Sequence, residues 1–245
     1  MNIVSQMCAI AVMLVIMYFY VSQKKIILHT SRAFVEVWIA GMLSLFFDIF
    51  SLVAIEKRDG YPLTATNIIC KLYLWTVTWV AMVAFWYICV DIFRKKELEC
   101  KWRKRLFIFG IITDILIMSV PIKIYDTDNI VYTYGPAVII TYAVTVSLLG
   151  LILLLTKKYR QVINSRRRKS MQVWVTLMFS AAVIQFINNK LLIVGFASMI
   201  GVLIIFIMLE NPMANIDRDT GLFNLNAFFE YMKAVYYTHL TLPTN

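Results

Sequence analysis

The amino-acid sequence predicts an all-α membrane protein with seven transmembrane helices, an outer N-terminus and a cytoplasmic C-terminus. Hydrophobic residues make up 61% of the 245 residues and charged residues only 16%, whereas soluble domains average about 45–50% and about 25%. Seven stretches are long and apolar enough, or nearly so, to cross about 30 Å of hydrocarbon as helices. Lys and Arg collect in alternate loops, which is the pattern that orients membrane proteins.

The seven expected spans follow one another with short connections, the fourth and sixth being short and the third long. They are predicted at Ile3–Ser22, Phe34–Ile55, Asn67–Phe93, Leu106–Ile122, Pro136–Thr156, Met171–Ile187 and Leu191–Leu209. The first span does not resemble a signal peptide, because no basic residue precedes it and no small-residue cleavage site follows it before Lys24. We therefore expect it to remain in the protein as a membrane anchor.

The orientation follows from the distribution of basic residues. The loops after the first, third and fifth expected spans, together with the C-terminal tail, hold 19 Lys and Arg residues. The opposite side holds four, Lys57, Arg58, Lys123 and Lys190, and Lys71 lies within the third span. Because basic residues collect in cytoplasmic loops, this split predicts an outer N-terminus.

The basic residues also bear on partners. The formal net charge is +10, but no nucleic-acid-binding fold or motif accompanies it, so a nucleic-acid partner is not expected. Contact of the loops with anionic lipid headgroups is compatible with the charge. The four cysteines show no CxxC spacing and no His partner, which argues against a zinc site or a redox motif.

Five polar side chains within or beside the expected spans are candidate functional residues: Asp48, Lys71, Asp114, Gln185 and Asn188. An ionisable group at the bilayer centre costs about 2.5–3.5 kcal/mol on insertion scales. Asp48 and Lys71 lie about 10 Å and about 6 Å from the outer ends of consecutive spans, so we expect them to form an ion pair. The alternative is that Lys71 extends to the outer headgroups and Asp48 is protonated.

These residues also suggest a binding site. A polar outer pocket lined by Asp48, Lys71 and the cluster Gln185–Lys190 would suit a small ligand, although polar residues at helix ends are ordinary. The longest outer loop, 123–135, holds Asp126, Asp128 and Asn129 without the spacing of an EF-hand. A hairpin with tyrosines at the membrane interface is the expected structure of this loop.

The composition changes after residue 209. The sequence Glu210-Asn211-Pro212 is expected to end the last span, because the residue before Pro is pushed away from the α region. The expected division is a membrane domain (1–209), a linker (210–216), the start of a cytoplasmic domain (217–235) and a final segment (236–245). Because that last segment has no Asp, Glu, Lys or Arg, we expect it to be a foreign extension of a truncated reading frame.

Residues 217–228 read Asp-Arg-Asp-Thr-Gly-Leu-Phe-Asn-Leu-Asn-Ala-Phe. This segment resembles the opening of GGDEF domains, usually written Asp-x-Leu-Thr-Gly-Leu-x-Asn-Arg-x-x-Phe. Asp219 stands in place of the family's Leu and Leu225 in place of its Arg. The matching positions are Asp217, Thr220, Gly221, Leu222, Asn224 and Phe228.

The preceding region, with Tyr-x-Tyr-Gly-Pro at residues 132–136, also resembles the sensor regions found before GGDEF domains and sensor kinases. The resemblance implies the membrane sensor region of a bacterial diguanylate cyclase-type protein of cyclic-di-GMP signalling, present as a homodimer and responding to an unidentified stimulus. It implies Mg²⁺ and GTP only for the catalytic part. The Gly-Gly-Asp-Glu-Phe loop is absent from this sequence, so no catalytic, cofactor-binding or metal-binding residue is expected within it.

Three alternatives remain open. A degenerate GGDEF domain ahead of an EAL phosphodiesterase domain fits the departure at Leu225, and a histidine kinase could follow a similar sensor region. A small transporter is disfavoured, because the sequence shows no internal repeat and has only 8 Gly and 5 Pro.

Overall fold

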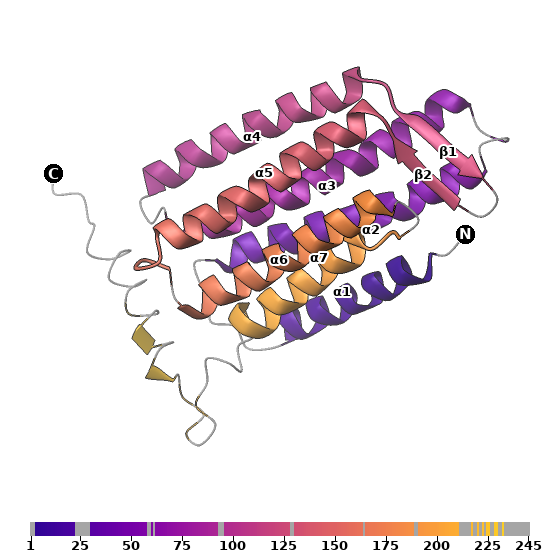
Figure 1. Ribbon diagram of the computed structural model, residues 1–245. Coiled ribbons are helices and arrows are strands. Elements are labelled where there is room, and N and C mark those ends of the chain that lie inside the picture. Colours follow the sequence, from indigo (N-terminus) through magenta and orange to yellow (C-terminus); the bar gives the residue numbers. More distant parts are fainter. Residues whose placement is uncertain are drawn as a thin grey trace.

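The computed structural model describes residues 3–22, 30–57, 60, 62–92, 96–127, 130–163, 165–188 and 191–210, and positions 217, 220, 222, 224, 225, 228, 229 and 232. Over these residues, seven α-helices lie side by side in a bundle with one β-hairpin at one end (Figure 1). The helices are α1 Val4–Ser22, α2 Ser31–Glu56, α3 Leu63–Ile92, α4 Lys96–Ser119, α5 Pro136–Lys158, α6 Ser165–Ile187 and α7 Val194–Ile205, with a π-helical turn, η2, at Phe206–Glu210.

The helices confirm the expected all-α architecture, and α1, α2, α3, α5 and α6 are long and apolar enough to cross a membrane. The helical segment 194–210 is apolar but shorter. Helix α4 begins ten residues before the expected span, in a basic segment rich in the good helix formers Lys, Arg and Glu. It ends at Ser119, before Val120-Pro121, because Pro disfavours helical geometry in the residue that precedes it.

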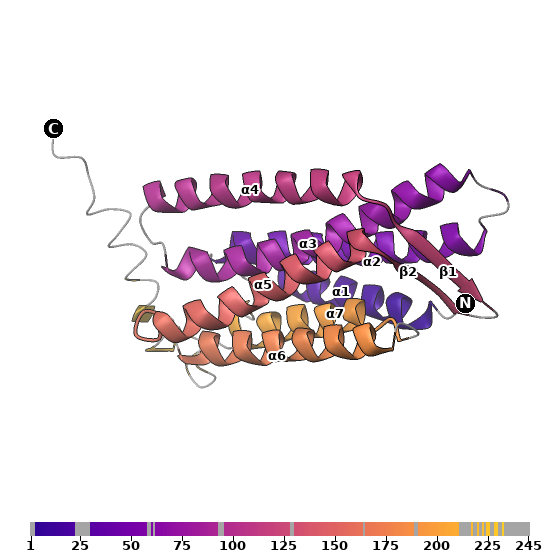
Figure 2. The ribbon, with the colours of Figure 1, turned by 45° about the horizontal axis from the view of Figure 1, so that its top comes forward.

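The largest buried cluster joins α1, α2, α3, α5, α6 and α7. Its fully buried large side chains include Phe34, Tyr87 and Trp174. Helix α7 lies among α1, α2 and α6, whereas α4 lies to one side of the bundle and contacts α3 and α5 (Figure 2). The helix that leads toward the C-terminal segment is therefore enclosed by its neighbours.

The outer surface of the bundle is apolar. Exposed side chains on α4 include Phe107, Ile108, Ile112 and Ile115, and α1 exposes Val15 among others. Soluble monomers rarely expose contiguous apolar surface of this kind, whereas helices in a bilayer present it to the lipid tails. The surface and the helix lengths together are compatible with a multi-pass membrane protein.

The expected hairpin is present. Strand β1 (Lys123–Thr127) pairs antiparallel with β2 (Ile130–Tyr134), with Lys123 opposite Tyr134. Gly135 has a φ of +113°, a conformation that glycine adopts without steric cost, and it turns the chain into α5. The side chains of Asp126, Asp128 and Asn129, considered above as cation ligands, lie outside the described residues.

The described positions after residue 216 form a local turn. The backbone N–H and the hydroxyl of Thr220 both donate to Asp217 Oδ1, each at 3.0 Å, and the Asp217 N–H donates to the Leu222 carbonyl at 2.7 Å. The Phe228 N–H donates to the Asn224 carbonyl at 2.9 Å, as in a helical turn. Gly221, the linker residues 211–216 and the segment 236–245 lie outside the described residues.

Candidate functional site

A pocket lies at the hairpin end of the bundle, between α2, α3, α5, α6 and the start of α7. Its cavity has a volume of about 80 Å³, and Thr133 of β2 and Leu192 of the α6–α7 connection form part of its wall. Two of the five sequence-predicted candidates, Asp48 and Gln185, line it. Its other polar lining side chains include Ser51, Tyr73, Thr141, Tyr142 and Thr145. We call this cavity the hairpin-end pocket.

The expected ion pair between Asp48 and Lys71 is wrong. Asp48 is only 4% exposed, and Gln6 Nε2 donates to its Oδ2 at 3.1 Å. Lys71 Nζ instead donates to the Met118 carbonyl at the end of α4, at 2.7 Å. The two residues lie on neighbouring helices, but the Asp48 side chain is directed toward α1 and the Lys71 side chain toward α4, so they do not meet.

These contacts make a prediction about stability. Asp48→Asn and Lys71→Met should destabilise the protein additively, within about 0.3–0.5 kcal/mol, because they share no partner. Asp48→Asn and Gln6→Leu should be coupled by about 0.5–3 kcal/mol, because their side chains are hydrogen-bonded. Denaturant unfolding in detergent measures both cycles. A coupling energy between Asp48 and Lys71 that matched the Asp48–Gln6 value would contradict the observed contacts.

Gln185 has a structural role that its position in the sequence did not indicate. Its Oε1 accepts hydrogen bonds from the backbone N–H groups of Ile193 and Val194, both at 3.0 Å. These are donors at the start of α7, where the first N–H groups of a helix have no partner within the helix. Gln185 therefore joins the pocket wall to the N-terminus of α7.

The other sequence candidates do not line the pocket. Asn188 is exposed at the end of α6. Asp114 lies on α4, where its Oδ2 accepts from Trp79 Nε1 at 2.8 Å and its carbonyl accepts from Trp75 Nε1 at 3.0 Å. Lys71 and Asp114 thus both take part in the contact between α3 and α4. We assign them to the packing of that helix pair.

A second polar cluster is buried at the opposite end of the bundle, around Glu210 at the end of η2. Glu210 is 4% exposed. Its Oε1 accepts from Thr30 Oγ1 and from the Tyr87 hydroxyl, both at 2.8 Å, and its Oε2 accepts from Ser31 Oγ at 3.3 Å. Arg167 Nη2 donates to Thr30 Oγ1 at 3.0 Å. These five residues, the Glu210 cluster, join α2, α3, α6 and η2.

Arg167 is the unexpected member. The charge count placed it in a cytoplasmic loop, but it is only 8% exposed and its guanidinium lies 5.3 Å from the centre of the Tyr87 ring. The reason is that α6 begins at Ser165, six residues before the expected span, and carries Arg167 into the bundle. Its neighbours at helical spacing, Ser170 and Trp174, are also buried.

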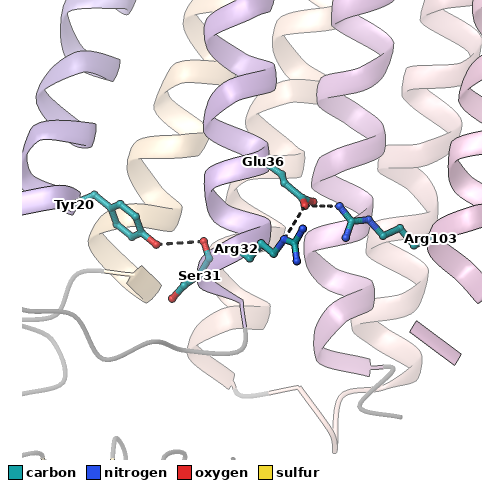
Figure 3. Close-up of polar contacts among 5 residues, drawn as sticks. All are labelled: Tyr20, Ser31, Arg32, Glu36 and Arg103. Carbon is teal, nitrogen blue, oxygen red and sulfur yellow. Dashed lines mark hydrogen bonds and ion pairs between the residues drawn. The ribbon is translucent and has the colours of Figure 1, made fainter. Parts of the chain in front are cut away.

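Further polar contacts hold the same end of the bundle (Figure 3). The Tyr20 hydroxyl donates to the Ser31 carbonyl at 3.2 Å and so ties α1 to α2. Glu36 of α2 lies between two arginines, 2.5 Å from Arg103 Nη2 and 3.8 Å from Arg32 Nε. Because these arginines are largely exposed, each pair contributes only about 0–1 kcal/mol.

Helix α7 and its π turn connect the two ends. A Cβ built on Gly195 would lie 3.5 Å from Asp48 Oδ2, so the first turn of α7 lies directly against the carboxylate of the pocket. Glu210 ends the same continuous helical segment fifteen residues later, about 22 Å away at 1.5 Å per residue. Among the described residues, α7 with η2 is thus in contact with both polar sites.

Searches against protein-family models and against curated proteins found no match for this chain. The features of the chain that bear on its function are the two polar sites and the helix between them.

Proposed function

We propose that this protein is a membrane-embedded sensor domain that passes a signal from the hairpin-end pocket to the segment that follows Glu210. The observation that carries the proposal is the placement of α7. Its N-terminus is held by Gln185 and lies against Asp48, and its π turn ends in the buried carboxylate of Glu210. No other helix in the described part of the chain combines these two contacts with a continuation toward residues 217–232.

The Glu210 cluster suits a switch. Hydroxyl donors from Thr30, Ser31 and Tyr87 hold the carboxylate, and a small rotation or translation of α7 would exchange them. A π turn takes in an extra residue relative to an α turn, and such turns occur frequently at functional sites. A change at the pocket that shifts α7 would thus alter the bonds at Glu210 and the position of the following chain.

In this proposal all seven helices cross the cell membrane, with the hairpin end outside and the Glu210 end cytoplasmic. The distribution of basic residues supports this orientation, because α1, α3 and α5 end on the Glu210 side of the bundle and the basic loops follow these helices in the sequence (Figure 1). The apolar part of α4 after Arg105 has fourteen residues, or about 21 Å, which is short of about 30 Å of hydrocarbon. Basic side chains that extend to the headgroups, or local thinning of the bilayer, would accommodate this helix.

Native cysteines test the orientation. Cys100 is exposed at the basic end of α4, whereas Cys70 and Cys89 are buried. In a Cys8→Ser background, which removes the other exposed cysteine, we expect a membrane-impermeant maleimide to label Cys100 only after permeabilisation, and to label an added Thr133→Cys in intact cells. The buried pair is the internal control and should stay unlabelled in both conditions. Labelling of Cys100 in intact cells would reverse the proposed orientation.

For the output we propose cyclic-di-GMP signalling, on the resemblance of residues 217–228 to the opening of GGDEF domains. The turn in which Thr220 bonds Asp217 is compatible with that signature. In cells that express the gene in full, Glu210→Gln should change the cellular cyclic-di-GMP level relative to wild type. Synthesis of cyclic-di-GMP from GTP would indicate the cyclase, hydrolysis of cyclic-di-GMP would indicate the phosphodiesterase, and transfer of a phosphoryl group from ATP to a histidine would indicate a histidine kinase.

Coupling between the two ends is tested directly by hydrogen exchange in lipid nanodiscs, without any ligand. We expect Asp48→Asn to change the exchange of the segment Phe206–Glu210, which lies about 16–22 Å along α7 from the turn that contacts Asp48. Ser119→Ala, which removes a hydroxyl at the same end but outside the pocket, is the control and should leave that exchange unchanged. The sensor proposal fails if Asp48→Asn changes hydrogen exchange only in the residues around position 48. It also fails if exchange in α4 rises as much as exchange in Phe206–Glu210.

A further inference from the structure

The groups that line the hairpin-end pocket indicate the chemistry of its ligand. Asp48 is a buried carboxylate whose described hydrogen-bond donor, Gln6, is neutral. The ion pairs between described residues are made by Glu36 with Arg32 and Arg103, and Asp48 takes part in neither of them. An ionised carboxylate in a poorly solvated site requires a compensating positive charge. The protein does not supply that charge from any residue that the structure describes.

The hydroxyl groups of the pocket are arranged mainly to accept hydrogen bonds. Ser51 Oγ donates to the Asp48 carbonyl at 2.8 Å, and Thr141 Oγ1 donates to the Ala137 carbonyl at 3.0 Å. Because each hydroxyl donates its only proton to a backbone carbonyl, its oxygen can act toward a ligand in the cavity only as a hydrogen-bond acceptor. With the Asp48 carboxylate, these oxygens favour a ligand that donates.

The unpaired hydroxyl of Thr145 is further evidence that the pocket binds a ligand. It lines the pocket, is 6% exposed, and its Oγ1 has no hydrogen-bonding partner within the described structure. A buried polar group left without a partner costs about 1–3 kcal/mol, so such groups are rare in native proteins. A ligand that reaches both Asp48 and Thr145 would remove that cost.

We propose that the hairpin-end pocket binds a small primary ammonium compound, with Asp48 as its counter-ion. An ammonium group carries one positive charge and three N–H donors, which matches one carboxylate and several hydroxyl acceptors. Tyr73 and Tyr142 line the same cavity and can stabilise a cation through their ring faces. The volume of about 80 Å³ admits a few carbon atoms rather than a drug-sized ligand, which needs about 300–1,000 Å³.

This ligand class rests on the proposed sensing role of the pocket, and its test is binding rather than signalling. Isothermal calorimetry on the full chain in neutral nanodiscs, with n-propylammonium chloride as the probe, should give saturable binding. Asp48→Asn should weaken the affinity on the order of tenfold to a hundredfold, because a charge-assisted hydrogen bond is lost. Thr145→Val should weaken it about threefold to tenfold, because a neutral hydrogen bond is lost.

The chain offers matched controls for both substitutions. Asp114→Asn changes a buried aspartate outside the pocket, and Thr66→Val removes another buried hydroxyl that has no partner within the described structure. Both variants should bind the probe as the wild type does, and an equal loss in them would overturn the proposed site.

Two further titrations separate the ligand classes. Equal binding of 1-propanol would show that charge is not recognised, and equal binding of sodium chloride would indicate an inorganic cation site. Either result, or no saturable binding of the ammonium probe, overturns this inference. The exchange experiment on Asp48→Asn is made without ligand, so it tests the sensor proposal independently of these titrations, which test the ligand class.

Discussion

Gly201→Ala is expected to destabilise the bundle more than any other single methyl addition among the described glycines. A Cβ built on Gly201 would overlap the Trp174 indole, a side chain that is 1% exposed. A rigid ring in a packed core cannot move aside as the end of a flexible side chain can. Overpacking of a core typically costs about 1–3 kcal/mol, and we expect a loss at the upper end of that range. The thermal midpoint of the detergent-solubilised chain measures it.

Gly150 provides the matched control for this change. It also lies within a helix, α5, but a Cβ there would meet nothing within 4 Å. Gly150→Ala should therefore be neutral or stabilising by up to about 1 kcal/mol, since Ala is the better helix former. Trp174→Leu should partly rescue Gly201→Ala, so that the double variant loses less than the sum of the two single variants. Equal stability of the two alanine variants would contradict the close α6–α7 contact.

The sequence was sufficient to predict the helices and the hairpin, because both have strong local signals. Runs of about twenty apolar residues indicate membrane-length helices, and the polar loop that ends in Gly135-Pro136 indicated the hairpin. Helix ends were less predictable. Helix α6 begins in Ser-Arg-Arg-Arg, which carries no apolar signal, and that error concealed the burial of Arg167.

The pocket was predictable only in part, for a geometric reason. Asp48 and Gln185 were both expected to line a polar outer pocket, and the structure brings both to the cavity. Depth does not specify which face of a helix a residue occupies, so Lys71 was included wrongly. Thr141 and Thr145 are four residues apart on one helix face, and this spacing was the available signal for the missing wall.

The Glu210 cluster was missed because its members come from four elements that lie far apart in the sequence. Glu210 and Thr30 are 180 positions apart, and Glu210 and Tyr87 are 123 apart. The motif Glu-Asn-Pro correctly marked the end of the last helix, but it led to the assignment of Glu210 to a linker. Local sequence rules describe where a helix ends; they do not show that its last residue is buried.

Glu210→Ala is the second substitution for which we expect a large effect. It would leave the hydroxyl donors of Thr30 and Tyr87 without their acceptor, and would leave the buried Arg167 beside them. A hydrogen bond to a charged group contributes about 1.5–3 kcal/mol, and Glu210→Ala removes those from Thr30 and Tyr87 together. Denaturant unfolding in detergent should show this loss, and hydrogen exchange should rise in Phe206–Glu210. Glu210→Gln, which keeps one acceptor oxygen, should lose less.

Glu36→Ala is the matched control, because it also removes a glutamate from the same end of the bundle. Its partners Arg32 and Arg103 are largely exposed (Figure 3), so the loss should be about 0–1 kcal/mol. Tyr87→Phe removes one donor and keeps the ring beneath Arg167, and it should lie between these limits, at about 1.5–3 kcal/mol for a hydrogen bond to a charged group. If Glu210→Ala unfolded no more easily than Glu36→Ala, the cluster would not hold the end of α7. A signal that moved α7 would then have no bonds at Glu210 to exchange.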